Sequence, residues 1–180
     1  MNISDLTDVV SAASEARGKE VEAILNFQEH VVKEQGTLGQ DEFWPELDKF
    51  VAIVKKFRDG FKRSNWSEQA ADEFFRAAIC QDRDALIRCI RFVATYEAKV
   101  AKICKTMDRL EKDGTHELGL GDDGFGDLCD SFLLHGRDAY ERLMEEGVVP
   151  KNPALGENYI AMNLTRAAKE WVRNCVAWRP

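Results

Sequence analysis

The chain has 180 residues, of which 44% are hydrophobic and 32% are charged, and its formal net charge is −7 at pH 7. This length suits a single domain that buries enough apolar surface to fold alone, and the composition argues against intrinsic disorder. No apolar run reaches the length of a membrane span, and the first residues lack the pattern of a signal peptide. We therefore expect one soluble, cytoplasmic domain over residues 1–180.

The first two predicted helices cover roughly residues 4–34 and 41–63. Ser4 is the predicted N-cap of the first helix, which ends at the turn between Gly36 and Gly39. In the second, apolar residues recur every three or four positions, as expected of one buried helix face. Its predicted buried residues are Phe43, Leu47, Phe50, Val54, Phe57 and Phe61.

A third helix is predicted from Ser67, with a break near Gln81-Asp82 before a longer helix over residues 83–112. One unbroken helix from Ser67 to Lys112 is the alternative, but it would overhang a globule of this size. The longer helix carries four heptads of apolar residues, the spacing of coiled coils and long bundle helices. This seam consists of Leu86, Cys89, Val93, Tyr96, Val100, Ile103, Met107 and Leu110.

Residues 113–126 contain five glycines and are predicted to be a loop. A helix over residues 127–146 should follow, with Gly147 as its stop, and a last helix should open at Asn152-Pro153. No strand pattern of useful length occurs. The predicted fold is an all-α, up-and-down bundle of five to six helices.

Charge is unevenly distributed along the chain. The net charge is −8 over residues 1–48, +6 over residues 49–112 and −5 over residues 113–180. Within the long helix, six of the eight outward c and f heptad positions are basic, although like charges at this spacing repel each other. The six basic residues are Arg88, Arg91, Lys102, Lys105, Arg109 and Lys112.

Three interpretations of this basic stripe are open. It could bind an acidic surface of another protein or of a second copy of this chain. It could instead bind nucleic-acid phosphates without reading sequence, although the pI near 5.1 argues against this. In the third interpretation, the acidic ends of the chain fold over the stripe and neutralise it.

Other candidate sites have weaker support. The acidic segment 122–127, with Asp130 a turn later, lacks the spacing of an EF-hand, so capping and turn formation explain it best. Metal-binding helical bundles use clustered carboxylates, or histidines spaced as H-x-x-x-H or E-x-x-H, on facing helices. The sequence contains neither pattern. The spacing of Arg109 and His116 resembles the R-x(4–6)-H motif of HEPN ribonucleases, in which the arginine and histidine contact RNA at a dimer cleft. Because Gly114 and Thr115 interrupt the motif here, that resemblance is loose.

Five cysteines are scattered without a C-x-x-C pair, which is typical of small core residues in a reducing compartment. A redox or nucleophilic thiol is the alternative. They are Cys80, Cys89, Cys104, Cys129 and Cys175. Trp66, in a predicted turn, and Trp178, near the end of the sequence, are candidate interface anchors, although Trp178 also continues an apolar stripe.

Together these patterns favour a protein–protein interaction module: an adaptor, a regulator or inhibitor, or a small subunit of a complex. We predict that Trp66 and the basic stripe contact the partner. The sequence indicates no catalytic residues, metal, cofactor, small-molecule ligand or membrane association. A nucleic-acid-contacting helical subunit is the alternative function, and an enzyme of HEPN-like or other helical-bundle type is a third.

Overall fold

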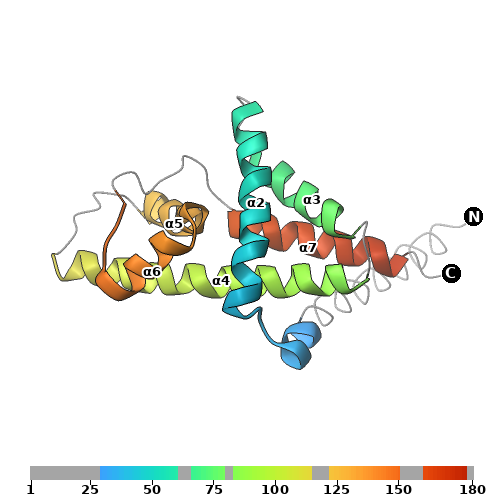
Figure 1. The fold of residues 1–180 in the computed structure, drawn as a ribbon, viewed down its shortest axis with the longest axis horizontal. Helices are drawn as coiled ribbons and strands as arrows, with labels where there is room; N and C mark the ends of the chain where they lie inside the picture. Colours follow the sequence, from blue (N-terminus) through green and yellow to red (C-terminus); the bar gives the residue numbers. More distant parts are fainter. Residues whose placement is uncertain (1–28, 61–65, 80–82, 115–121, 151–159, 178–180) are drawn as a thin grey trace, which may run out of the picture.

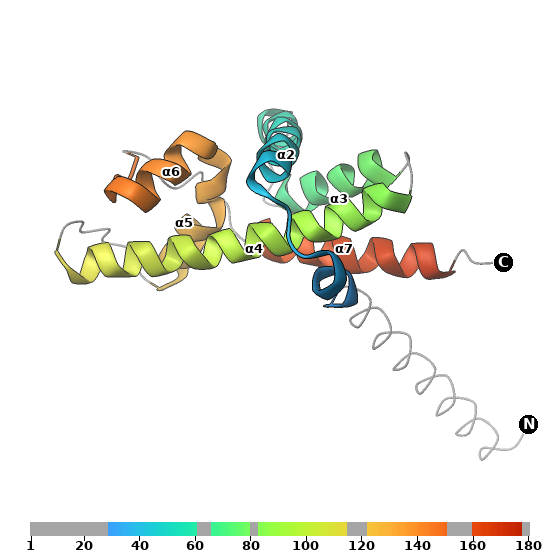
Figure 2. The same ribbon diagram turned by 60° about the horizontal axis from the view of Figure 1, so that its bottom comes forward.

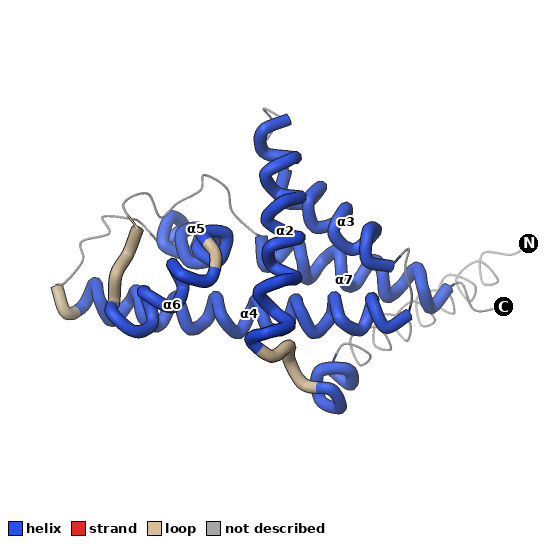
Figure 3. The backbone as a smooth tube through the Cα atoms, in the orientation of Figure 1, coloured by secondary structure: helices blue, strands red, loops and turns tan. Residues whose placement is uncertain are grey.

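The computed structural model describes residues 29–60, 66–79, 83–114, 122–150 and 160–177. Every regular element in these ranges is helical and none is a strand, which confirms the all-α prediction (Figure 3). A helical segment over residues 29–35 precedes the labelled elements. These are α2 (Gln40–Gly60), α3 (Trp66–Ile79), α4 (Arg83–Lys112), α5 (Asp122–Ser131), the 3₁₀ helix η1 (Phe132–His135), α6 (Arg137–Glu146) and α7 (Ile160–Ala177).

Helix α4 is the long axis around which the other helices are arranged (Figures 1 and 2). Helices α3 and α7 pack against each other and against the N-terminal half of α4, whereas α5, η1 and α6 lie along its C-terminal half. Helix α2 crosses α4 steeply near the middle of α4. The predicted helical bundle is thus confirmed, with α2 running across α4 rather than alongside it.

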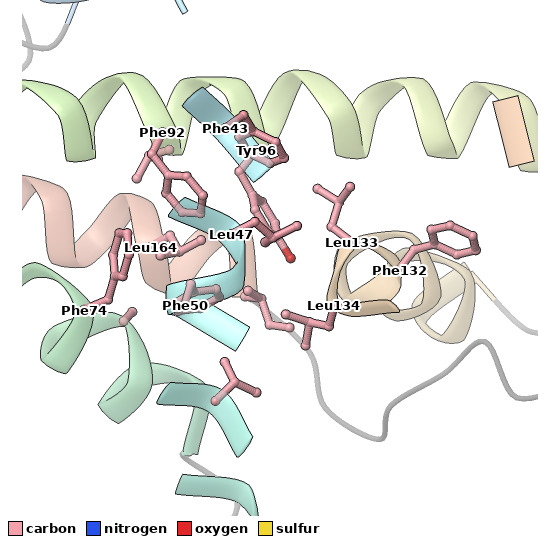
Figure 4. Close-up of a cluster of buried hydrophobic side chains, with 14 of the residues drawn as sticks. Phe43, Leu47, Phe50, Phe74, Phe92, Tyr96, Phe132, Leu133, Leu134 and Leu164 are labelled. Carbon is pink, nitrogen blue, oxygen red and sulfur yellow. The ribbon is translucent and has the colours of Figure 1, made fainter. Parts of the chain in front are cut away.

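The predicted heptad seam of α4 faces the core. Seven of its eight residues are buried, and Val100 is partly buried against the same cluster. Phe92, beside the seam, stacks on Phe43 of α2 with ring centroids 5.3 Å apart and lies 5.0 Å from the Phe74 ring of α3. Figure 4 shows these rings with Phe50 and Tyr96, and Leu133 of η1 beside them. Aromatic packing thus joins α2, α3 and α4 in one core.

The predicted separation of two helices near residue 81 is confirmed, because α3 ends at Ile79 and α4 begins at Arg83. Helix α2 begins within one residue of the predicted position. The C-terminus of α4 is also as expected, since Gly114 adopts a positive φ of 67° and its N–H donates to the carbonyl of Glu111 at 3.0 Å. A left-handed residue of this kind ends a helix, and glycine adopts it without steric cost.

Two predicted boundaries are wrong. Residues 122–126 belong to α5 rather than to a loop: the acidic start suits a helix N-terminus, and Phe125 packs against the core despite the two neighbouring glycines. The expected helix over residues 127–146 is divided into α5, η1 and α6. The 3₁₀ turn allows Phe132, Leu133 and Leu134 all to be buried, and Gly136 at φ 88° then redirects the chain.

Several predicted features lie outside the described residues. These are most of the first helix, the start of the last helix at Asn152-Pro153, the side chain of Cys175, and the residues Phe61, Cys80, His116 and Trp178. Of the first helix, residues 29–35 are helical, and Val31 is buried against Leu86 and Ile90 of α4.

Candidate functional site

The six residues of the predicted basic stripe differ in how far their side chains are exposed to solvent. Arg88, Lys102, Lys105, Arg109 and Lys112 are exposed, whereas the Arg91 side chain is only 19% exposed. The heptad pattern placed all six on outward positions, yet one of them faces another part of the chain.

Arg91 holds the segment that leads into α2. Its guanidinium donates hydrogen bonds to the backbone carbonyls of Gly36 and Thr37, both at 3.1 Å, and lies 3.4 Å from a carboxylate oxygen of Glu42. These contacts satisfy carbonyls at the end of the helical segment 29–35. Arg91 thus has a structural role within the chain.

Thr95 lies one turn further along α4 and is buried, although it occupies a c position of the heptad. Its hydroxyl accepts a hydrogen bond from the backbone N–H of Leu38 at 2.8 Å and donates to the carbonyl of Arg91 at 2.7 Å. The segment before α2 therefore crosses the outward face of α4 at Arg91 and Thr95. This crossing divides the stripe.

Lys99 is a buried charged residue of α4 that the heptad pattern did not indicate. Only 8% of Lys99 is exposed, and its ammonium nitrogen lies over three aromatic rings. The distances to the ring centroids are 5.1 Å for Phe43, 4.8 Å for Trp44 and 4.3 Å for Tyr140. Burial lowers the pKa of Lys99, and the positive charge of Lys102 lowers it further.

The cation–π contacts of Lys99 join α2, α4 and α6 at one point. Its heptad position, g, lies beside the seam, so partial burial of the alkyl stem could have been expected from spacing. The aromatic partners come from distant parts of the sequence, and no local pattern indicates them.

Beyond this crossing, Lys102, Lys105 and Arg109 form an exposed basic surface, which we call the distal basic face. None of these three side chains forms an ion pair with another residue in the described ranges. Lys112 differs, since its ammonium lies 2.7 Å from the carboxylate of Asp108 on the same helix. Arg88 is also exposed, but it lies on the other side of the crossing.

Trp66 is buried rather than exposed. It is the first residue of α3, not part of a turn, and only 5% of it is exposed within the main hydrophobic core. The predicted use of Trp66 as an exposed anchor therefore has no structural support. Its neighbour Ser67 accepts a hydrogen bond from the side-chain amide of Asn163 at 2.8 Å, which ties α3 to α7.

The acidic segment contributes a helix cap. The carboxylate of Asp130 accepts a hydrogen bond from the backbone N–H of Ala161 at 2.9 Å, in the first turn of α7. Capping an N-terminal N–H is a common role of aspartate. Over the described ranges, no three His, Cys, Asp or Glu side chains are grouped so that they could hold a metal ion.

Among the helices that the structure describes, none combines the length and apolarity needed to cross a bilayer. Comparison of the chain with protein-family models, curated proteins and solved structures finds no match. The geometry of α4 and the helices around it is therefore the basis for a functional proposal.

Proposed function

We propose that this chain is a protein–protein interaction module that binds an acidic protein surface through the distal basic face of α4. The observation that supports this most directly is the exposure of Lys102, Lys105 and Arg109 without an acidic partner among the described residues. Three cations on neighbouring turns of one rigid helix present a fixed pattern to a docking surface. An acidic partner would relieve their mutual repulsion.

The surroundings of the face favour a protein partner over nucleic acid. Exposed carboxylates of Asp108 and Glu111 lie on the same helix, close to the basic residues, and Asp108 already pairs with Lys112. A phosphate backbone has no positive group to match these carboxylates. A protein surface of mixed charge can pair with both signs, which also gives specificity.

A charge-reversal experiment tests the proposal. The variant K102E/K105E/R109E removes the distal basic face, and K55E/K56E/K169E makes the same change in net charge at exposed lysines elsewhere. Both variants and the original chain are immobilised and exposed to a cell lysate, and the captured proteins are quantified by mass spectrometry. We expect specific proteins to be lost at least tenfold from the first variant and retained by the second.

Three further measurements distinguish the partner classes. Sedimentation velocity over a range of concentrations detects self-association, and a glutamate-rich peptide with interspersed lysines and a short single-stranded RNA serve as defined probes. Binding to this mixed-charge peptide that requires the distal basic face supports the proposal. Equal capture by both charge variants overturns it, and so does a steep salt dependence of binding that is seen with RNA alone.

A further inference from the structure

A cavity lies between α2, α3 and the first turns of α4, and no residue of the distal basic face lines it. Its volume is about 410 Å³, which is within the range of small-molecule sites in proteins. The described lining residues come from all three helices. They include both buried apolar side chains and exposed charged ones, so the cavity can contact the two ends of an amphipathic molecule.

The apolar part of the cavity wall belongs to the main hydrophobic core. Phe74 of α3 and Ala85 and Cys89 of α4 line it and are buried. Neighbouring rings hold Phe74 in place, since its ring centroid lies 5.0 Å from that of Phe92 and 5.5 Å from that of Phe50 (Figure 4). Burial raises the pKa of Cys89 to about 12, so its thiol stays uncharged. This wall is preformed and suits the apolar body of a ligand.

The described charged side chains that line the cavity carry one unbalanced positive charge. Lys49 of α2 pairs with Glu46, with 2.8 Å between the ammonium nitrogen and a carboxylate oxygen, so these two charges offset each other. Arg88 of α4 is exposed, and its side chain forms no hydrogen bond or ion pair with another described residue. A guanidinium group donates two parallel hydrogen bonds to a carboxylate, which makes arginine a specific partner for that group.

We propose that this cavity binds a small organic monocarboxylate with an apolar body. The carboxylate pairs with Arg88, and the apolar body packs against Phe74, Ala85 and Cys89. One unbalanced cation matches one negative charge, so a dianion such as a phosphate monoester fits less well. The inference concerns a ligand site on the other side of the crossing, and it does not depend on the proposed docking role of the distal basic face.

The test uses 4-phenylbutyrate as the probe, with the full chain labelled at its isoleucine and alanine methyl groups for NMR. Two molecules with the same apolar body are the matched controls: 4-phenylbutanol lacks the charge and 4-phenylbutylamine reverses it. We expect 4-phenylbutyrate to shift the methyl signals of Ile53, Ala77 and Ala85, which all line the cavity, until the site is saturated. The alcohol and the amine should bind at least about tenfold more weakly, because neither accepts two hydrogen bonds from a guanidinium group.

Two pairs of variants separate the charge from the space. Arg88→Gln should weaken binding of 4-phenylbutyrate at least about tenfold and leave that of the alcohol unchanged, whereas Arg142→Gln, at an exposed arginine of α6, should affect neither. Ala77 is exposed as well as lining the cavity, so Ala77→Phe should fill part of the cavity and abolish binding. Ala98→Phe, at an exposed alanine of α4 outside the cavity, should bind like the original chain. Circular dichroism checks that each variant is folded.

Titration of the original chain requires no substitution, so the inference stays falsifiable even if a variant fails to fold. Lack of a saturable shift at Ile53, Ala77 and Ala85 with up to about 10 mM 4-phenylbutyrate would overturn it. Shifts confined to methyl groups outside the cavity would also overturn it. Equal affinity for the acid, the alcohol and the amine, or unchanged affinity in Arg88→Gln, would show that the cavity does not select a carboxylate through Arg88.

Discussion

The two halves of α4 have the same heptad pattern and similar basic residues, but their surroundings differ. In residues 83–97, α2, α3, α7 and the segment 29–35 cover most of the helix, and Arg91 is used to hold the chain together. In residues 98–112, α5, η1 and α6 cover only the seam side, and Lys102, Lys105 and Arg109 remain exposed. Charge on the outer face of this helix is thus either paired within the chain or left exposed, according to which element crosses it.

The cysteines of the two halves provide the largest expected contrast. Cys89 and Cys104 are both free, but burial raises the pKa of Cys89 to about 12, whereas the interaction with Cys129 lowers the pKa of Cys104 to about 7. At pH 7 we expect iodoacetamide to modify Cys104 at least about a hundredfold faster than Cys89, because only the thiolate reacts and far less of Cys89 is ionised. The Cys104 rate should rise with pH and level off above about pH 8, whereas the Cys89 rate should still be rising there. Peptide mapping after timed quenching measures both, and equal rates would contradict the contrast.

Truncation of a core side chain should cost more stability in the first half of α4 than in the second half. Phe92 is fully buried among Phe43, Phe50, Phe74 and Tyr96. Phe92→Ala should lower the free energy of unfolding by about 3–5 kcal/mol, through lost burial and an unfilled cavity. Val100→Ala, in the less covered half, should cost about 1 kcal/mol, since Val100 is only partly buried. Urea denaturation measures both, and similar losses would show that the two halves are equally packed.

Lys99 lies at the boundary between the halves. Lys99→Ala removes three cation–π contacts and the packing of a buried stem, so it should cost about 2 kcal/mol. Lys102→Ala, on the exposed face, should change stability by less than about 0.5 kcal/mol. The same denaturation experiment provides the comparison. A loss at Lys102 as large as that at Lys99 would mean that the distal basic face has intramolecular partners.

Replacing an arginine should also cost more stability in the first half of α4 than in the second, although the difference should be smaller. Arg91→Ala removes hydrogen bonds to the carbonyls of Gly36 and Thr37 and should cost about 1–2 kcal/mol. Arg109→Ala should have no measurable effect on stability, because no described residue pairs with it. Thermal unfolding of the two variants side by side tests this, and a larger effect of Arg109→Ala would reverse the assignment.

Features determined by local periodicity could be predicted from the sequence. Most of the buried face of α2, the seam of α4 and the stop at Gly147 follow from helical spacing and turn chemistry, and the structure confirms them. On α2, Phe43, Leu47, Phe50 and Val54 are buried, and Phe57 is partly buried. The wrong boundaries of α5 and α6 have a different origin. Packing of Phe125 and of the three consecutive apolar residues in η1 decides them, and such tertiary contacts override the local glycine signal.

The candidate site was predictable only in part. Heptad positions gave the basic stripe, but they could not show that the segment before α2 crosses it at Arg91 and Thr95. Nor could they show the aromatic rings around Lys99, since Phe43, Trp44 and Tyr140 are distant from it in sequence. Residues that meet only through tertiary packing leave no periodic signal.

The accessibility of the distal basic face can be measured directly by covalent labelling of lysines. The full chain is treated briefly with N-hydroxysuccinimidyl acetate, and the rate at each lysine is followed by mass spectrometry. Lys102 and Lys105 should react within about threefold of the exposed lysines Lys55 and Lys169. Rates at Lys102 and Lys105 at least about tenfold slower than at these references would show that another part of the chain covers the face, and would contradict the proposed docking role.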